Sequence, residues 1–380
     1  MTSSSPKLMF FVSVDWFFCS HFLERAMAAR DAGYDVVVVT DIGEHGDRIT
    51  RAGLRPIHLK LDRRSVNPIL GLMTLIKLIR ILRTEKPDIL HQVALKPILI
   101  GTLAARICKV PHLINAIVGG GYIFSSEKLL ARALRALLAL ALKSLLNPIG
   151  SKVVFENRDD LTAFVQKGYV RERDAVLIAG AGVDPGNYQR ADLSSSSPLV
   201  VLVARLLWDK GIGEFVEAAR QIRDLRVSAR FVVVGDVDPA NRAAIDASVI
   251  NAWKNEGYVE FWGFRTDMAN VLKQASIACL PSYREGLPKS LLEAMAAGLP
   301  CVTTDVPGCR SAVRDGDNGL LVQPRDAQSL AAALIRLIRD VDLRQRMGNR
   351  GLDRVTAEFS STRVIEQTLL LYRQMGAHQA

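Results

Sequence analysis

The feature that most limits the fold of this chain is the alternation of short, continuous apolar runs with longer helical patterns. The first run, at 8–14, is followed by a helical pattern at 21–32 that ends at Gly33, and by a second run at 35–40. Continuous apolar runs are typical of strands buried on both faces of a parallel sheet. A strand, a helix and a second strand at this spacing form a βαβ unit. The sequence therefore predicts an α/β protein.

The same pattern begins a second time in the middle of the chain. Further runs of the first half lie at 57–59, 88–91, 112–115, 153–155 and 175–178. Four serines at 194–197, closed by Pro198, form the clearest linker. New runs follow at 199–203, 230–234, 259–262, 277–280 and 301–303. We expect two doubly wound, Rossmann-like domains facing a central cleft: 1–193, then the linker 194–198, then 199–358.

The charge of the chain favours an anionic partner. Its 49 Lys and Arg residues exceed its 39 Asp and Glu residues, which gives a net charge of +10. Aromatic residues are sparse and no helical pattern carries a dense basic stripe, so nucleic acid is not favoured. Ten basic and three acidic residues lie between Lys60 and Lys109. This uneven distribution favours a membrane surface.

Cysteine spacing and hydropathy indicate the cellular compartment in which the protein is expected. The five cysteines are scattered and form no CxxC pair, so neither a disulfide framework nor a zinc site is expected. The amino terminus is too short and too interrupted by Asp15 for a signal peptide, and no uncharged apolar run reaches 18 residues. We expect a cytoplasmic protein, peripherally associated with the inner face of the cell membrane.

Residues 129–146 form a strongly apolar helical pattern that carries Arg132, Arg135 and Lys143. With three cations it is a poor membrane span. One interpretation places it in the plane of the lipid headgroups, with its arginines reaching the phosphates. The other makes it a buried helix between the domains with a cationic edge. The composition leaves both open.

The strongest candidate for a binding site lies at 280–298. The run at 276–280 predicts a buried strand, a polar loop follows, and the helix after it begins at Pro288 and ends at Gly298. Glu285 then lies on a loop at the carboxyl end of a strand, where open α/β sheets bind ligands. Glu293 lies on the next helix, whose amino terminus suits a phosphate. Two carboxylates beside an anion site suit a sugar attached to a diphosphate, because carboxylates accept hydrogen bonds from hydroxyls.

Two cations follow the first strand of the second domain. Arg205 and Lys210 lie on its loop, which is expected to face the same cleft. Arg offers a planar fork of donors for phosphate oxygens, whereas Lys is a compact charge. Together they are suited to neutralise a leaving diphosphate, which makes a metal ion unnecessary.

The spacing of Glu285 and Glu293, with EGLP and LLEAMAAGLPCV around them, resembles the signature of retaining family-4 glycosyltransferases of GT-B fold. The resemblance implies that Glu285 contacts the donor sugar, that Glu293 binds the nucleotide ribose, and that Arg205 and Lys210 hold the diphosphate. It also implies that the carboxyl-terminal helix, at 359–380, crosses back to the first domain. The segments ARLLWDKGIGEF, LPSYREGLP and VFENRDD look like the bacterial enzymes that extend undecaprenyl-diphosphate-linked glycans, closest to those adding N-acetylgalactosamine.

Further donor-binding candidates lie at strand ends of the second domain. Glycine at a strand end lets a ligand approach the backbone closely. By resemblance, the loop after VEFWG reads the nucleobase, with a phenylalanine near its face; glycines that only form turns are the alternative. The expected donor-binding set, besides Glu293, is Gly286, Leu287, Pro288, Ser290, Gly235, Gly263, Phe264 and Arg265.

First-domain candidates are more dispersed. His91 is expected to end a strand and, by resemblance, to contact the donor sugar near its reactive carbon; a purely structural histidine is the alternative. The expected acceptor or sugar-side residues are Asp15, Lys96, Gly120, Gly121 and Asn157. The first strand is followed by Asp15 and aromatic residues rather than by GxGxxG, so no dinucleotide cofactor is expected.

These features predict a retaining glycosyltransferase that uses no cofactor or metal. We expect it to move a hexose or N-acetylhexosamine from a UDP-linked sugar, for instance UDP-GalNAc, to a polyprenyl-linked glycan. Glu285, His91, Arg205 and Lys210 form the expected catalytic set. A nucleotide-sugar epimerase of the same fold and a non-catalytic membrane-bound nucleotide-binding subunit are the alternatives.

Overall fold

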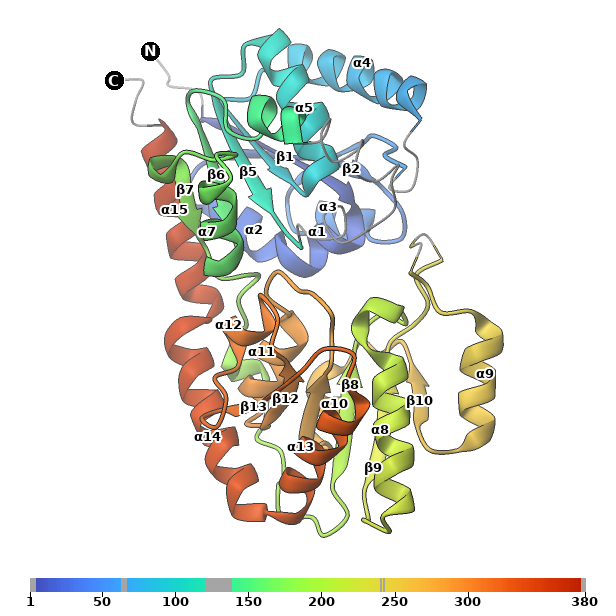
Figure 1. The fold of residues 1–380 in the computed structure, drawn as a ribbon. Helices are drawn as coiled ribbons and strands as arrows, with labels where there is room; N and C mark the ends of the chain where they lie inside the picture. The colour runs from blue at the N-terminus through green and yellow to red at the C-terminus, as the bar shows by residue number, and fades with distance from the viewer. Residues whose placement is uncertain (1–4, 63–66, 120–138, 240, 242, 377–380) are drawn as a thin grey trace. The chain divides into compact units, whose positions relative to one another are not determined.

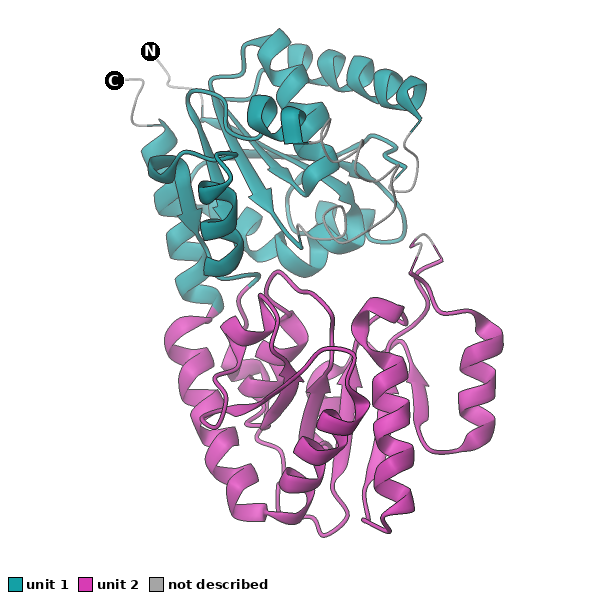
Figure 2. Ribbon diagram, viewed as in Figure 1, with its two compact units in different colours: residues 1–181, 361–380 teal, residues 182–360 magenta. Residues whose placement is uncertain are grey.

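A computed structural model describes residues 5–62, 67–119, 139–239, 241 and 243–376, and its chain divides into two compact units. Unit 1 comprises Met1–Ala181 and Ser361–Ala380, and unit 2 comprises Gly182–Ser360 (Figure 2). Each unit is built on one sheet whose strand pairs are all parallel. The predicted α/β class with two Rossmann-like domains is confirmed.

Unit 1 contains a seven-stranded sheet in the order β3-β2-β1-β4-β5-β6-β7. Its strands are β1 (Lys7–Val14), β2 (Asp35–Asp41), β3 (Arg55–His58), β4 (Ile89–Val93), β5 (His112–Ile117), β6 (Ser151–Phe155) and β7 (Ala175–Leu177). The order runs outward in both directions from β1 and β4, which makes unit 1 doubly wound. The continuous apolar runs are explained by this topology, because central strands are buried on both faces.

Helices cover both faces of the unit 1 sheet (Figure 1). They are α1 (Asp15–His21), α2 (Leu23–Asp31), α3 (Gly46–Arg51), α4 (Pro68–Glu85), α5 (Leu95–Cys108), α7 (Arg158–Gln166) and α15 (Ser361–Gly376), with a 3-10 turn η2 at Glu172–Asp174. The sheet has a hydrophobic core on each face, and alternate side chains of β1 pack into one core or the other. Phe10 packs with α1, α2 and α15, whereas Phe11 packs with α4 and α5. Residues 139–145 are helical, so only the end of the apolar segment 129–146 lies within the described residues.

The start of the chain differs from the expected strand, loop and helix. α1 begins directly after β1 as an additional helix, and α2 (Leu23–Asp31) follows it at the place of the predicted helix 21–32. The reason is burial of an aromatic cluster: the rings of Phe18 and Phe22 both make edge contacts with Phe10. The chain therefore turns into a helix immediately instead of forming an exposed loop.

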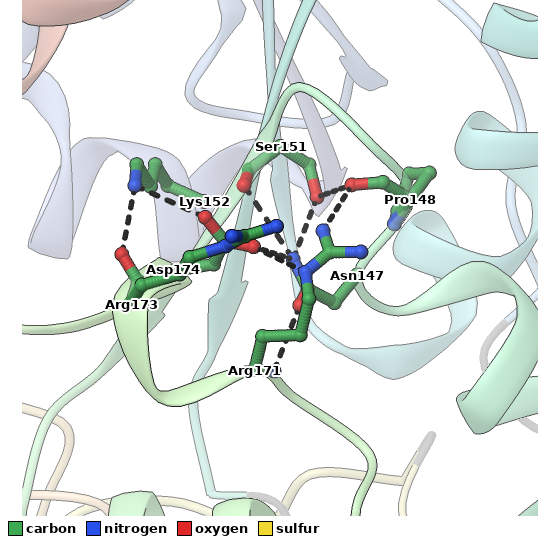
Figure 3. A network of polar contacts seen from close by, with 7 residues as sticks. All are labelled: Asn147, Pro148, Ser151, Lys152, Arg171, Arg173 and Asp174. Atoms are coloured by element: carbon green, nitrogen blue, oxygen red, sulfur yellow. Dashed lines mark hydrogen bonds and ion pairs between the residues drawn. The ribbon is translucent and has the colours of Figure 1, made fainter.

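A polar network fastens the end of the unit 1 sheet near β7 (Figure 3). The Arg171 guanidinium donates to Asp174 at 2.5 Å and to the Pro148 carbonyl at 2.9 Å, and Lys152 Nζ lies 3.1 Å from the other Asp174 oxygen. Asn147 adds a bond of 3.1 Å to Ser151 Oγ. Ser151 begins β6 and Asp174 directly precedes β7, so the network lies at the amino-terminal edge of the sheet. That edge is opposite to the one where α/β sheets bind ligands, and we assign the network a structural role.

Unit 2 contains a six-stranded parallel sheet in the order β10-β9-β8-β11-β12-β13. Its strands are β8 (Leu199–Val203), β9 (Arg230–Val234), β10 (Glu260–Gly263), β11 (Ile277–Leu280), β12 (Cys301–Thr304) and β13 (Gly319–Val322). Its helices are α8 (Ile212–Asp224), α9 (Ala247–Glu256), α10 (Met268–Lys273), α11 (Lys289–Ala296), α12 (Cys309–Ala312), α13 (Ala327–Arg339) and α14 (Val341–Glu358), with 3-10 turns η3 (Pro185–Asn187) and η4 (Trp208–Lys210).

The first boundary between the units lies earlier than the predicted linker at 194–198. Residues 182–193 belong to unit 2, because the fully buried Arg344 of α14 donates to the carbonyl oxygens of Leu193 and Ser195. Ala191 N also donates to Ala297 O at 3.0 Å. The serine-rich segment is thus fixed to unit 2 by a side chain 149 positions after Ser195, which composition does not reveal. The second boundary, at 360/361, lies within two residues of the expected return at 359.

Candidate active site

The centre of the unit 2 sheet, between β8 and β11, is its topological switch point. From these two strands the order continues to β9 and β10 on one side and to β12 and β13 on the other. Ligands of open α/β sheets bind at the carboxyl ends of the strands beside such a point. The loop after β8 carries Arg205 and Lys210, and the loop after β11 carries Glu285. The structure therefore brings three of the four predicted catalytic residues to one place.

Backbone hydrogen bonds hold these two loops together. The Asp209 carbonyl accepts from both Ser282 Oγ and Tyr283 N at 2.9 Å. Gly211 has φ +70°, and a Cβ there would lie 2.1 Å from the Pro281 carbonyl oxygen, so only glycine permits the approach. The Tyr283 hydroxyl donates to Glu214 Oε1 of α8 at 2.6 Å. The loops form one fixed support for the charged residues between them.

Lys210 and Glu285 form an ion pair at the switch point. Lys210 Nζ lies 2.5 Å from Glu285 Oε1, and their side chains are only 18% and 12% exposed. Gly308, with φ +82°, lies behind Glu285: a Cβ there would come within 2.6 Å of the carbonyl oxygens of Glu285 and Gly286. The position of the carboxylate is therefore fixed by a salt bridge on one side and by close backbone packing on the other.

Arg205 has an acidic partner that the sequence did not reveal. Its guanidinium lies 2.5 Å from Asp238 Oδ2, and the Asp238 side chain is only 10% exposed. Asp238 follows β9, so this contact joins two neighbouring loops at the same edge of the sheet. The acid-rich stretch after FVVVG was a possible signal, but the pairing of Arg205 with Asp238 depends on the order of the strands.

Glu293 lies on α11 in a nearly enclosed position. Its side chain is 15% exposed, and Lys289 Nζ lies 3.7 Å from its Oε1. Burial raises the pKa of Glu293, whereas Lys289 and the side chain of Tyr188 act in the opposite direction. Tyr188 is a second residue that the sequence missed, since it precedes the predicted linker. A carboxylate placed here can accept hydrogen bonds from a pair of hydroxyls.

The other predicted donor-binding residues of 286–290 lie between these two glutamates. Pro288 is the N-cap residue of α11, and Leu287 is buried beside it. Gly286 packs against Gly308, and Ser290 lies half-buried in the first turn of α11. Glu285 thus precedes the helix amino terminus and Glu293 lies about a turn inside it, as predicted.

The loops after β9 and β10 hold the remaining predicted donor residues. Gly235 N donates to the Gly263 carbonyl at 2.9 Å, and a Cβ at Gly235 would lie 1.9 Å from the Ala204 carbonyl oxygen. Phe264 is 70% exposed, and Arg265 pairs with Asp267 at 2.6 Å. An exposed aromatic ring at this edge is available to stack on a nucleobase.

His91 has a different environment from the one predicted. It lies in the middle of β4, between Phe10 of β1 and Ile114 of β5, and is 2% exposed. Its Nδ1 lies 2.7 Å from the Tyr372 hydroxyl of α15. Burial, reinforced by Arg25, lowers the pKa of His91 to about 3, so the imidazole is neutral. These surroundings favour the structural alternative, and the contact of His91 with the donor sugar stays a prediction.

The acceptor-side candidates of unit 1 also make internal contacts. Asp15 is 3% exposed and accepts from Gly43 N at 2.7 Å and from His45 N at 2.9 Å. Asn157 is the N-cap of α7 and accepts from Asp160 N at 2.8 Å. Lys96 donates to the Asp62 carbonyl. Asp15 and Asn157 therefore hold the backbone in place rather than present a free polar group, while Gly120 and Gly121 lie outside the described residues.

The described residues contain neither a cluster of metal ligands nor a membrane-spanning helix. Within the described residues, no three His, Cys, Asp or Glu side chains gather closely enough to hold a metal ion. Over the same part of the chain, no helix combines the length and apolar character that a membrane span requires. The expectation of metal-independent catalysis stays a prediction.

Two doubly wound units, one with a charged site at its switch point, give this protein the GT-B fold. The solved structure of HepE from Anabaena in complex with UDP and glucose shares this fold, with a TM-score of 0.77, 18% identity and coverage of 97% of this chain and 99% of HepE. Residues 7–148 match the family described as Glycosyl transferase 4-like, and residues 197–340 match Glycosyl transferases group 1. The chain carries both of these domains and is a glycosyltransferase.

Two curated relatives extend over most of the chain. An N,N'-diacetylbacillosaminyl-diphospho-undecaprenol α-1,3-N-acetylgalactosaminyltransferase from Campylobacter jejuni is 28% identical over 330 residues, covering 83% of this chain and 85% of that protein. A UDP-Gal:α-D-GlcNAc-diphosphoundecaprenol α-1,3-galactosyltransferase from Escherichia coli is 27% identical and covers 73% of each. Relatives therefore act on undecaprenyl-diphosphate-linked glycans, and the class is that of an enzyme rather than a binding subunit.

Proposed function

We propose that the protein transfers a hexose or N-acetylhexosamine from a UDP-sugar to an undecaprenyl-diphosphate-linked glycan, with retention of the anomeric configuration. The observation that carries this proposal is the pairing of Lys210 with Glu285 at the switch point of unit 2. A cation for the leaving diphosphate and a carboxylate for the sugar hydroxyls lie within contact of one another there. The site thus has one group that binds the leaving diphosphate and one that binds the sugar, on the two sides of the bond that breaks.

In this proposal each charged side chain binds a different part of the nucleotide-sugar donor. Arg205 and Lys210 bind the diphosphate, and because its charge grows as the bond to the sugar breaks, they stabilise the transition state more than the bound donor. Glu285 accepts hydrogen bonds from sugar hydroxyls. Glu293 accepts them from the ribose, and Phe264 stacks on the base. Glu285 and Asp238 form ion pairs with Lys210 and Arg205, so donor binding exchanges these carboxylates for phosphates.

The reaction proceeds on one face of the sugar. The bond between the anomeric carbon and the diphosphate oxygen breaks, and a bond from the acceptor hydroxyl oxygen forms on the same face. The acceptor proton passes to an oxygen of the departing phosphate, so no protein base is needed. The α-1,3 linkages in the names of both relatives support retention, because a sugar α-linked to its nucleotide gives an α-linked product this way.

The acceptor assignment rests on the two relatives and on charge. Both names specify a diphospho-undecaprenol acceptor, and this chain has a net charge of +10. A basic protein is attracted to the anionic surface in which such an acceptor is anchored. We therefore propose peripheral association with the inner face of the cell membrane.

Calorimetric titration with UDP, GDP, ADP and CMP tests the donor assignment. We expect UDP to bind, and Glu293→Ala to weaken it at least tenfold, because the ribose loses its acceptor. The matched control is Glu366→Ala, which removes an exposed glutamate of α15 in unit 1. Binding of GDP alone would contradict the UDP assignment, and equal UDP affinity in Glu293→Ala would contradict the role of Glu293.

A further inference from the structure

The outer face of α4 is apolar over its first half. Ile69, Leu72, Met73 and Ile76 are 67%, 55%, 50% and 42% exposed, and Leu70 is 44% exposed. The spacing of the first four places them on one side of a helix. The opposite side, with Leu78 and Leu82, is buried in the core. α4 therefore has an apolar stripe facing inward and a second one facing solvent.

The same outer face becomes basic over the second half of α4. Lys77, Arg80 and Arg83 are exposed, and they follow Met73 and Ile76 at intervals of three or four residues. The only acid of the helix, Glu85, is on the inner side and pairs with Arg55 at 2.6 Å. Within α4 the exposed arc therefore carries no carboxylate to neutralise its cations.

The neighbouring helix continues this surface. α5 lies beside α4, with Cys108 Sγ 3.7 Å from the Ile79 carbonyl oxygen (Figure 1). Leu103 and Ile107 are 40% and 48% exposed, and the sequence of α5 contains no acid. Its exposed cation, Arg106, lies between them. α5 thus adds exposed apolar side chains and a cation beside α4, although Arg106 also donates to the Ser144 carbonyl at 2.6 Å.

The chemistry of this surface selects its partner. Several neighbouring exposed aliphatic side chains on a protein surface mark an interaction site. A second copy would bring the uncompensated cations of both chains to one interface, where like charges oppose association. Helices with apolar residues on one face and Lys and Arg beside them instead lie in the interface of anionic lipid bilayers.

We propose that the outer face of α4, with Leu103 and Ile107 of α5, is the surface by which this enzyme docks on an anionic lipid bilayer. The first half of α4 enters the acyl boundary, and Arg80 and Arg83 lie at the headgroup phosphates. The proposal deepens the proposed function, since it rests on an acceptor held in a membrane. It names α4 as the docking element rather than the apolar segment at 129–146.

Vesicle flotation with the full chain tests this, using phosphatidylglycerol–phosphatidylcholine vesicles against pure phosphatidylcholine. One variant combines Leu72→Gln, Met73→Gln and Ile76→Gln; the other combines Arg80→Gln and Arg83→Gln. Each basic residue near an anionic surface contributes about fivefold to partitioning. We therefore expect the basic variant to bind the anionic vesicles about twenty-five-fold more weakly, and the apolar variant at least about tenfold.

Matched controls replace exposed residues elsewhere. Leu225→Gln with Leu370→Gln removes apolar groups that are 62% and 54% exposed, and Arg336→Gln with Arg339→Gln removes exposed cations of α13. Both controls should float as the wild type does. UDP affinity, measured separately, should be unchanged in every variant, so a failure of the donor assignment is distinguishable from a failure of docking.

Three results would overturn the proposal. The first is wild-type protein that does not float with anionic vesicles. The second is that the α4 variants float like the wild type. The third is an apolar α4 variant that converts a dimer to a monomer in sedimentation, because a second copy would then cover this face.

Discussion

Asp238 shows how a single carboxylate can regulate the affinity of a phosphate site. It pairs with Arg205 at 2.5 Å, so in the proposed function a donor diphosphate competes with it for this guanidinium. The Arg205 side chain is 39% exposed, and ion pairs in such positions are worth about 1 kcal/mol or less. The competition is therefore modest, but it acts directly on the proposed donor contact.

We predict that Asp238→Asn tightens UDP binding up to about fivefold, because Arg205 is released for the diphosphate. Titration calorimetry measures the change. Asp236→Asn is the control, since it removes the same charge from the same loop but from an exposed residue whose carboxylate accepts from Val237 N. Weaker UDP binding in Asp238→Asn would show that Asp238 positions Arg205 rather than competes for it.

Glu293 leads to a prediction about pH. Burial raises its pKa, so the carboxylate takes up a proton at a higher pH than an ordinary glutamate. Ribose hydroxyls donate to the ionised form, so affinity for a UDP-sugar should fall as the pH is lowered through this raised pKa. A UDP-sugar is the suitable ligand because both its phosphates are esterified, whereas the terminal phosphate of UDP itself titrates near pH 6.

The measurement compares UDP-sugar affinity of the wild type and Glu293→Gln from about pH 7.5 to about pH 5. The variant should bind more weakly at neutral pH and show a flatter profile on the acid side. Parallel profiles for the two proteins would mean that another group causes the pH dependence.

At the scale of elements, α15 is fastened to unit 1 by a buried histidine. The contact of His91 with Tyr372 joins β4 to the helix at the end of the chain. The folded-state pKa of His91, about 3, lies below its unfolded value of about 6.5. Below about pH 6.5 the unfolded chain therefore binds a proton that the folded chain refuses, and stability is lost as the pH falls.

We predict that His91→Gln reduces the acid dependence of stability by up to about 1.4 kcal/mol per pH unit between about pH 6 and pH 4. Urea unfolding at several pH values measures it, with His58→Gln as control because His58 is 56% exposed. Sugar transfer near pH 7.5 should be retained within a few-fold in the folded variant. A loss of about a thousandfold in activity without loss of stability would restore the catalytic role of His91.

Arg344 acts on two elements of unit 2 together. Its guanidinium donates to the carbonyls of Leu337 and Ile338 in the last turn of α13, and to those of Leu193 and Ser195. The side chain ends one helix and holds the segment that precedes β8.

We predict that Arg344→Met lowers the free energy of unfolding by about 3 kcal/mol or more, because several buried carbonyls lose a charged donor. Arg346→Met is the matched control, since Arg346 is exposed on the same helix. Chemical denaturation of both variants gives the comparison. Equal stability of the two would show that water replaces the guanidinium.

At the scale of the whole molecule, regular patterns were predictable and long-range contacts were not. Apolar runs identified the strands of both sheets except β13 (Gly319–Val322), which was not predicted. Strand ends identified the loops with Arg205, Lys210 and Glu285. This succeeded because parallel strands place their carboxyl ends at one edge. The pairing of Arg205 with Asp238 was not predictable, because it depends on which strands are neighbours.

Two differences between the sequence-based expectations and the structure share a physical cause. His91 has the residue type of a catalytic group, but its exposure is decided by the packing of α15, which is 281 residues away at Tyr372. The serine-rich segment has the composition of a linker, but Arg344 fixes it to unit 2. In both cases a tertiary contact overrides what local sequence indicates.

The most direct test is transfer itself, with a synthetic polyprenyl-diphosphate-linked acceptor and the UDP-linked forms of N-acetylgalactosamine, galactose and glucose. Product analysis by mass spectrometry and by the anomeric proton coupling in NMR reports both transfer and configuration. We predict an α-linked product from a UDP-sugar, with turnover at least about a hundredfold lower in Glu285→Gln while UDP affinity is kept. A β-linked product, or undiminished turnover in Glu285→Gln, would contradict it.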